Sequence, residues 1–254
     1  MSDLSSFSLD GRRILVTGAN TGIGQGIAVA IARAGGAVIG VGRSAMDETA
    51  ARIAAIGGRF EAVACDLSDT ASAQSMLDRV WVESGPLDGL VNNAGIIRRA
   101  DAVDFSEADW DDVMDVNLKT LFFLSQSFGR KAIAAGRAGK IVNIASVLSF
   151  QGGIRVASYT ASKHGALGVT RLLACEWAAK GVNVNAIAPG YIETNNTEAL
   201  RADPDRSAAI LARIPAGRWG GPDDIGDAAV FLLAKASDYM HGAVIPVDGG
   251  WLAR

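Results

Sequence analysis

Short runs of branched, apolar residues alternate with helical stretches along nearly the whole chain. The first run, 13–17, stops at a glycine, and small and apolar residues then follow at helical spacing. This pattern predicts strands at 13–17, 38–41, 60–64, 87–91, 140–145, 182–188 and 243–247, and helices at 22–34, 47–56, 71–83, 107–135, 158–180 and 225–234. Because strand and helix alternate, we expect an α/β fold with a doubly wound, parallel, seven-stranded sheet and helices on both faces.

No linker or internal repeat divides the sequence, so we expect a single domain over 1–254. One segment, at about 191–222, breaks the alternation with Asp203-Pro204 and a glycine-rich end. A long connection inside a compact domain is usually a functional lid or a disordered segment. Because 208–214 is apolar enough to pack as a short helix, we interpret this segment as a substrate lid.

The charge balance excludes several classes of partner. The net charge is −3 without any block of like charges, which gives no support to a nucleic-acid or membrane-surface partner. Cys65, Cys175, His164 and His241 lack the spacing of a disulfide framework or a metal site, so we expect no metal. The N-terminus lacks a signal-peptide pattern, and no run of 18 apolar residues occurs. We therefore expect a cytoplasmic protein.

A glycine-rich loop joins the first predicted strand to the first predicted helix, with the sequence Thr17-Gly-Ala-Asn-Thr-Gly-Ile-Gly24. Glycines at 18, 22 and 24 allow a sharp turn and a close approach to a pyrophosphate, and the helix N-terminus offers free N–H groups. A structural turn is the alternative reading, because glycine is common in this chain. Its place between strand and helix favours dinucleotide binding.

The end of the second strand reads Val41-Gly42-Arg43-Ser44 and lacks the carboxylate that binds the ribose hydroxyls of NAD. Arg43 instead offers a planar set of donors that suits a 2′-phosphate. The alternative is a solvated arginine in a turn. We predict NADP or NAD as cofactor, with NADP favoured.

Tyr159 and Lys163 are four residues apart in a helical stretch and share one helix face. Ser146 lies at the end of the fifth strand, where open α/β sheets bind ligands. Lowering a tyrosine pKa from about 10 to about 7 requires roughly 4 kcal/mol of extra phenolate stabilisation. We expect the lysine ammonium and a positive nicotinamide to supply it, and Ser146 to donate to the substrate oxygen. The alternative is an amphipathic helix with an exposed lysine.

These motifs together resemble the short-chain dehydrogenase/reductase family over nearly the whole length, which implies a Rossmann-like fold and hydride exchange between an alcohol or ketone and a nicotinamide. The resemblance adds Asn117, which would hold a water behind the lysine, to the predicted catalytic residues Ser146, Tyr159 and Lys163. The predicted cofactor-binding residues are Gly18, Asn20, Thr21, Gly22, Ile23, Gly24, Arg43, Asp66, Leu67, Asn93, Ala94, Gly95, Tyr159, Lys163, Pro189, Gly190, Ile192 and Thr194.

Three side chains are predicted to bind substrate, namely Arg98, Gln151 and Arg155, with Arg99 and Asn195-Asn196 as further polar groups near the cleft. Arginine suits bidentate capture of a carboxylate. The alternative is that these arginines are surface charges or subunit contacts. The sequence at 95–99 and 152–159 resembles the branch of the family that acts on deoxygluconates, which implies a small anionic sugar-acid substrate.

Other functions are open at this point. A reductase of a 3-oxoacyl or polyol-type substrate would use the same residues, and so would an epimerase of the extended type, although only about 65 residues follow the sixth predicted strand. A non-catalytic nucleotide sensor is the third possibility. The family resemblance of the C-terminal segment, 245–251, implies a homotetramer.

Overall fold

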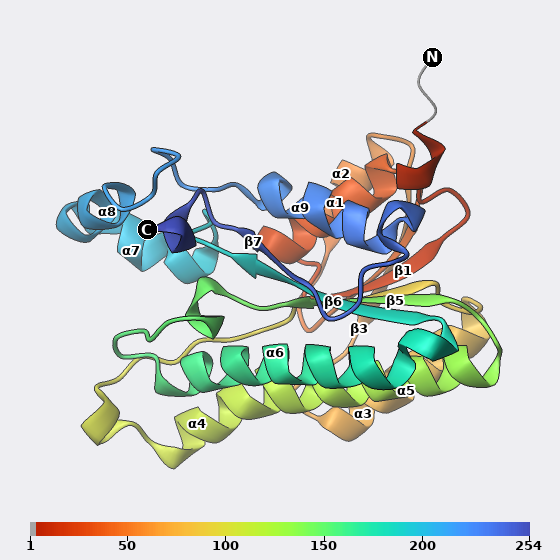
Figure 1. The fold of residues 1–254 in the computed structure, drawn as a ribbon, viewed down its shortest axis with the longest axis horizontal. Helices are drawn as coiled ribbons and strands as arrows, with labels where there is room; N and C mark the ends of the chain where they lie inside the picture. Colours follow the sequence, from red (N-terminus) through yellow and green to blue (C-terminus); the bar gives the residue numbers. More distant parts are fainter. Residues whose placement is uncertain (1–3) are drawn as a thin grey trace.

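The computed structural model describes residues 4–254, which form one parallel sheet with the strand order β3-β2-β1-β4-β5-β6-β7 (Figure 1). The strands are β1 (Arg13–Thr17), β2 (Ala37–Gly42), β3 (Arg59–Ala64), β4 (Gly89–Asn92), β5 (Gly139–Ile144), β6 (Val182–Pro189) and β7 (Val244–Val247). All neighbouring pairs are parallel. The predicted doubly wound seven-stranded sheet is therefore confirmed.

Helices cover both faces of this sheet (Figure 1). One layer contains α1 (Gly22–Arg33), α2 (Asp47–Ala54) and α9 (Pro222–Leu233). The other contains α3 (Thr70–Glu83), α4 (Glu107–Met114), α5 (Thr120–Ala134) and α6 (Ala157–Trp177). Single turns of 3-10 helix lie at Ser5–Phe7, Ala102–Asp104, Val147–Ser149, Ala178–Lys180, Asn195–Thr197, Lys235–Ser237 and Trp251–Ala253.

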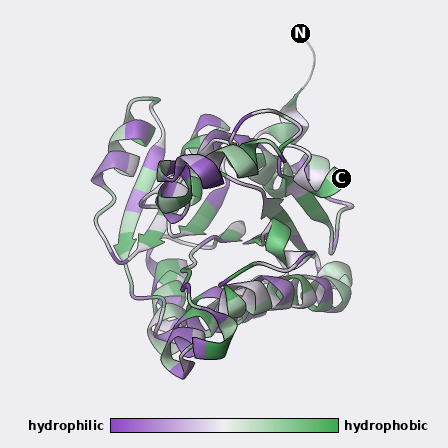
Figure 2. Ribbon diagram, turned by 90° about the vertical axis from the view of Figure 1, so that its left-hand side faces the viewer, coloured by the Kyte–Doolittle hydropathy of each residue, from purple (hydrophilic) through white to green (hydrophobic). Residues whose placement is uncertain are grey.

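The core consists of two apolar layers, one between the sheet and each set of helices. Ile14 and Val16 of β1 pack with residues of α1 and α9, whereas Leu15 packs with residues of α3 and α5 on the opposite face. Such alternation follows from the two-residue period of a strand whose two faces are both buried. Figure 2 shows hydrophobic residues concentrated on the strands, with mixed hydropathy on the helices around them.

The long helix predicted over 107–135 is interrupted. A π-helical turn, Asp115–Lys119, separates α4 from α5. It contains the buried Asn117, whose side chain exchanges two hydrogen bonds with the backbone of Ile96, at 2.8 and 3.0 Å. Single π-turns inside α-helices occur mostly at functional sites. The hydropathy pattern passes through this turn without a break, so it carried no signal for it.

The segment over 191–222 connects the end of β6 to the start of α9. An isolated parallel bridge pairs Ile192 with Gly220, so the two ends of the segment lie side by side. Between them lie α7 (Glu198–Ala202) and α8 (Pro204–Leu211). The helix predicted at 208–214 thus starts four residues earlier, because Asp203 caps it by accepting from the amides of residues 205 and 206 and Pro204 occupies its first turn.

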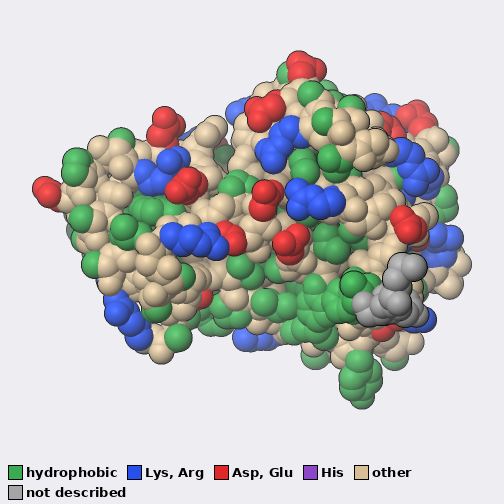
Figure 3. Space-filling view, turned by 90° about the horizontal axis from the view of Figure 1, so that it is seen from above, with side chains coloured by type: hydrophobic (Ala, Val, Ile, Leu, Met, Phe, Trp, Pro, Cys, Tyr) green, Lys and Arg blue, Asp and Glu red, His purple; other side chains and the backbone are tan. Residues whose placement is uncertain are grey.

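The fold brings the carboxyl ends of all strands to one edge of the sheet. The chain crosses over in opposite directions from the neighbouring strands β1 and β4, and ligands of open α/β sheets bind at such a point. The face seen from above in Figure 3 mixes acidic and basic side chains. Within residues 4–254, no helix combines the length and the apolar character that a membrane crossing requires.

Candidate active site

A cleft of about 540 Å³ lies at the carboxyl edge of the sheet, within the size range of small-molecule sites. Most of its lining comes from the loops after six strands, and the rest from α4, the π-helical turn and α6. Every residue predicted to bind the cofactor lines it, namely Gly18, Asn20, Thr21, Gly22, Ile23, Gly24, Arg43, Asp66, Leu67, Asn93, Ala94, Gly95, Tyr159, Lys163, Pro189, Gly190, Ile192 and Thr194. The structure thus brings these residues together, and their individual roles stay predictions.

The glycine loop is packed too tightly to accept side chains. Gly18 has a φ of +67°, and a Cβ there would lie 3.1 Å from the Cα of Ala94. A Cβ at Gly24 would collide with the carbonyl oxygen of Gly18. The loop leads into α1, whose first-turn amides have no partners within the helix. A bare backbone cradle at a helix N-terminus fits the pyrophosphate of a dinucleotide.

The far end of this cleft is formed by the loops after β2 and β3. A Cβ at Gly42 would meet only the side chain of Asn20, 3.5 Å away, and Arg43 is exposed on the cleft lining. Arg43 makes no ion pair within the described part of the chain. The pKa of Asp66 is lowered by hydrogen bonds from the backbone and hydroxyl of Ser68, and further by the charge of Arg43. This arrangement fits an adenosine ribose that carries a 2′-phosphate.

Tyr159, Lys163 and Ser146 meet at the inner end of the cleft. The Lys163 ammonium lies 5.5 Å from the centroid of the Tyr159 ring and donates a 2.6 Å hydrogen bond to the carbonyl of Ile144. Only 4% of Lys163 and 7% of Ser146 is exposed, so both polar groups sit in a water-poor environment. Ser146 follows β5, whereas Tyr159 and Lys163 are both on α6, and the crossover from β5 to α6 brings these two places together.

The expected lowering of the tyrosine pKa is not a property of the protein alone. Burial raises the pKa of Tyr159, partly offset by a hydrogen bond with Ser146 and by the charge of Arg99. Burial also lowers the pKa of Lys163 to about 8. The Lys163 ammonium bonds to the carbonyl of Ile144 and lies 5.5 Å from the centroid of the Tyr159 ring, so its effect on the phenol stays a prediction. We expect the positive nicotinamide of a bound cofactor to add to the charge that stabilises a phenolate.

Asn117 lies behind the cleft, outside its lining, on the π-turn between α4 and α5. Besides its two bonds to Ile96, its amide donates to the hydroxyl of Ser162 at 3.3 Å. Ser162 in turn donates to the carbonyl of Tyr159 at 2.8 Å. Asn117 is thereby linked to the helix that carries the tyrosine and the lysine, and its predicted role with water stays a prediction.

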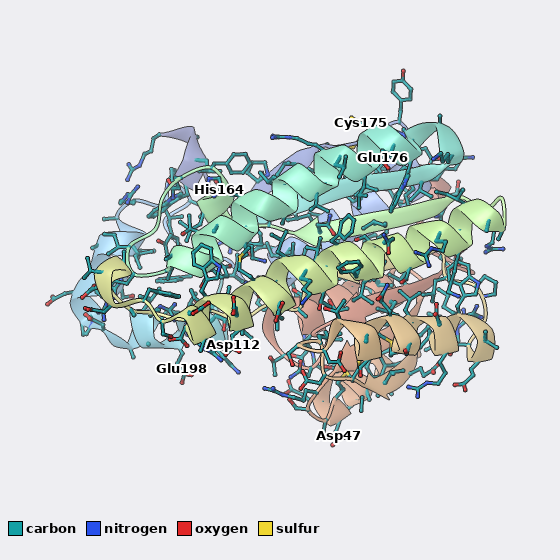
Figure 4. All side chains as sticks on the ribbon, turned by 90° about the horizontal axis from the view of Figure 1, so that it is seen from below. Asp47, Asp112, His164, Cys175, Glu176 and Glu198 are labelled. Atoms are coloured by element: carbon teal, nitrogen blue, oxygen red, sulfur yellow. The ribbon has the colours of Figure 1, made fainter. Side chains whose placement is uncertain are left out.

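The predicted substrate arginines differ in their surroundings. Arg98 lines the cleft but pairs with Asp109 at 3.2 Å and Asp112 at 3.0 Å. In Figure 4, Asp112 lies on α4 at the end of the molecule that carries Glu198 of α7. The side chains gathered around Arg98 therefore have a net charge of −1, from one cation and two carboxylates. Such a group does not attract an anion.

The structure does not bring Gln151 or Arg155 to the cleft lining. Arg155 has a left-handed φ of +64°, which turns the chain, and its side chain pairs with Asp101 at 3.1 Å. Arg99 also lies outside the cleft lining, but its charge reaches the reaction centre. Its guanidinium donates to the carbonyl of Asn196 at 3.2 Å, and its charge lowers the pKa of Tyr159 against the effect of burial. It has no carboxylate partner within residues 4–254.

Sequence reasoning missed several residues of the lining, namely Gly42, Ser44, Cys65, Ser68, Ile96, Asp112, Val116, Ile144, Ala145 and Thr197. Most directly follow a strand, and that position is the signal that finds them. Asn195 and Asn196, named as polar groups near the cleft, do line it. No group of three or more His, Cys, Asp or Glu side chains in the described residues is arranged to hold a metal ion. His164 and Cys175 lie on the outer side of α6 (Figure 4).

Comparison with known proteins matches this geometry to one family. The model for enoyl-(acyl carrier protein) reductase, which represents short-chain dehydrogenases and reductases, matches residues 18–252. The chain belongs to the short-chain dehydrogenase/reductase family. As a member it is an NAD(P)-dependent oxidoreductase that acts on CH–OH groups, as predicted.

Individual relatives are similar over their full length. The chain is 57% identical to a 2-dehydro-3-deoxy-D-gluconate 5-dehydrogenase from Escherichia coli (strain K12), with 99% of each chain covered. A candidate 2-deoxy-D-gluconate 3-dehydrogenase from Agrobacterium tumefaciens, solved with bound NADP, is 63% identical with a TM-score of 0.94 over 98% of this chain and 99% of that one. A candidate NAD(P)-dependent gluconate 5-dehydrogenase from Beutenbergia cavernae, with NADP at low occupancy, is 53% identical with a TM-score of 0.95 over 98% and 100%.

Proposed function

We propose that this chain is an NADP-dependent dehydrogenase of a deoxygluconate, 2-dehydro-3-deoxy-D-gluconate or 2-deoxy-D-gluconate. The observation that carries the proposal is a single cleft that joins a cradle for a dinucleotide to the Tyr159–Lys163–Ser146 group. Arg99 lies outside the cleft lining, but its charge acts on the tyrosine. The full-length relatives that share this fold are named for six-carbon sugar acids, which agrees with an anionic polyol as substrate.

NADP is favoured over NAD by the loop after β2. The carboxylate that would bind the ribose 2′-hydroxyl and repel a phosphate is replaced by Gly42, and Arg43 next to it is exposed on the cleft. Arginine binds phosphate through two parallel N–H groups. Both solved relatives described above contain NADP, which supports the same preference.

The reaction uses the residues at the inner end of the cleft. Bound NADP⁺ supplies a hydride acceptor for the carbinol carbon. Tyr159 takes the hydroxyl proton of the substrate, so that a ketone is left, and returns a proton in the reverse direction. The Ser146 hydroxyl donates to the substrate oxygen while charge develops on it. Lys163, 5.5 Å from the tyrosine ring, supplies positive charge that favours the phenolate, and Asn117 holds the water through which the proton leaves.

The substrate carboxylate binds to Arg99. Of the three arginines predicted near the cleft, Arg98 and Arg155 already pair with aspartates, whereas Arg99 bonds only to a neutral carbonyl in the described structure. Asn195 and Asn196 on the lining face the same space and suit the sugar hydroxyls. The segment over 191–222, which carries both asparagines, acts as the substrate lid.

The chain acts as a homotetramer in the cytoplasm. This part of the proposal rests on the family resemblance alone. Light scattering after size-exclusion chromatography measures the assembly, and a monomer at micromolar concentration contradicts it.

The test is a substrate panel. The purified chain is mixed with NADP⁺ or NAD⁺ and with deoxygluconates, gluconate, a neutral polyol or a 3-hydroxyacyl thioester, and formation of the reduced nicotinamide is followed by absorbance. We expect turnover with the deoxygluconates and NADP⁺, and a loss of about 10²- to 10⁴-fold in kcat for Tyr159→Phe, with cofactor affinity unchanged. Preference for the thioester refutes the substrate class, and wild-type activity of Tyr159→Phe refutes the mechanism.

A further inference from the structure

Ser149 connects two of the proposed catalytic residues without reaching the cleft. It lies in the 3-10 turn that follows Ser146, it is 5% exposed, and it is not part of the cleft lining. Its hydroxyl donates a 2.7 Å hydrogen bond to the carbonyl of Lys163 and accepts a 3.3 Å hydrogen bond from the amide of Ser146. We infer that Ser149 is a positioning residue that fixes Ser146 relative to Lys163, an inference that rests on the proposed roles of those two residues.

The hydrogen-bond roles of this hydroxyl are fixed by its neighbours. The Lys163 carbonyl only accepts, so the single Ser149 proton points to it, and the lone pairs that remain face the Ser146 N–H. A continuous path therefore runs from the Ser146 amide through Ser149 to the backbone of α6. The side chain of Lys163 makes a second link to the same strand end, through the carbonyl of Ile144 at 2.6 Å. The strand end and the helix are joined at two points.

This path also determines which way the Ser146 hydroxyl acts. In the same turn, the Ser146 oxygen accepts a 3.1 Å hydrogen bond from the amide of Leu148. With a backbone N–H on one of its lone pairs, the Ser146 hydroxyl still has its proton to donate, to the Tyr159 oxygen or to a substrate oxygen placed beside it. The turn thus orients the Ser146 hydroxyl as a hydrogen-bond donor. Ser149 is the third residue of this turn and completes its capping box.

Removal of the Ser149 hydroxyl leaves the Ser146 amide and one acceptor site of Lys163 without partners in a buried place. The turn then relaxes to regain hydrogen bonds, and Ser146 moves with it. A displacement of about 1 Å at a reacting group costs on the order of 10²-fold in rate. We expect Ser149→Ala to lower kcat by roughly 10- to 100-fold, while the affinity for NADPH stays within about twofold because the cofactor cradle is formed by other loops.

The experiment compares Ser149→Ala with a matched pair, Ser149→Thr and Ser149→Val, which have nearly equal volume and differ in the hydroxyl. Ser237→Ala is the stability control, because Ser237 is fully buried, its hydroxyl also bonds to backbone carbonyls, and it contacts Lys140 at the opposite edge of the sheet. Each variant is measured for kcat, KM, NADPH affinity, thermal stability and the primary deuterium isotope effect with 4-deuterated NADPH.

Support requires three results. Ser149→Ala loses kcat and shows a larger isotope effect, because the hydride step becomes rate-limiting; Ser149→Thr regains more kcat than Ser149→Val; and Ser237→Ala loses stability with kcat unchanged. Should Thr and Val both unfold, Ser149→Ala against Ser237→Ala decides alone. A kcat in Ser149→Ala that equals wild type, or that falls only as far as that of the control, overturns the inference. Ser146→Ala is assayed beside them: wild-type activity there refutes the proposed function itself.

Discussion

Replacement of Arg99 by glutamine tests how the cleft recognises an acid. Arg99 bonds to the carbonyl of Asn196 and has no carboxylate partner in residues 4–254, so its charge is available to a ligand. A hydrogen bond to a charged group contributes about 1.5–3 kcal/mol. Because Arg99 is exposed to solvent, we take the lower half of that range. Since each 1.4 kcal/mol corresponds to about tenfold, the KM for the sugar acid should rise roughly 10- to 40-fold.

The neighbouring arginines provide the controls. Arg155→Gln should leave the KM unchanged, because Asp101 already pairs with this side chain. Arg98→Gln should raise it by no more than about threefold, because the change leaves two carboxylates unpaired at the rim but removes no contact to the substrate. Initial rates are measured over a range of sugar-acid concentrations at saturating NADP⁺.

A neutral polyol of the same length separates carboxylate binding from general damage. Its KM should be equal in wild type and Arg99→Gln, since it has no carboxylate to lose. The reasoning is refuted if Arg99→Gln binds the sugar acid as well as wild type does, or if acid and polyol weaken equally. An effect of Arg155→Gln as large as that of Arg99→Gln would show that overall charge, not a specific contact, sets the KM.

Two further predictions concern charged groups of the cleft. Arg43→Ala should raise the KM for NADP⁺ about 10- to 100-fold and leave that for NAD⁺ within about twofold, because only a 2′-phosphate contacts the guanidinium; equal changes for both cofactors would disprove this. Burial lowers the pKa of Lys163 from 10.5 to about 8, so between these values the unfolded chain binds more protons and stability rises with pH. Relative to Lys163→Met, wild type should gain up to roughly 3 kcal/mol in unfolding free energy from pH 8 to pH 10.5, measured by urea denaturation, and a pH-independent difference would contradict the burial argument.

Local sequence signals predicted most of the sheet. The strand at 13–17 has the bounds that were expected, because a buried apolar run that ends at a glycine allows few other structures. The glycine loop was equally informative, since the spacing of Gly18, Gly22 and Gly24 after the first strand indicates where the first helix begins. For the cofactor half of the cleft, pattern and resemblance predicted residues that all lie on the cleft lining, and their roles stay predictions.

The substrate half depends on contacts between distant parts of the chain, and the sequence does not show these. Arg98 and Arg99 are adjacent and identical in type, yet aspartates of α4 neutralise only the first. The φ of Arg155 turns that residue towards Asp101, which no pattern predicted. The π-turn at Asn117 likewise depends on tertiary hydrogen bonds to Ile96, which outweigh the helical preference of the local sequence.

The bridge between Ile192 and Gly220 makes the structure of the sheet independent of the residues between them. Because the two ends of the segment over 191–222 are already hydrogen-bonded to each other, the sheet does not depend on the residues between these ends. Each doubling of a connecting loop costs only about 0.6 kcal/mol of closure entropy. Substitutions in this segment, which includes Asn195 and Asn196, would change the proposed substrate contacts while the residues proposed for hydride transfer stay in place. A fold of this kind supports new substrate specificities through changes in this one segment.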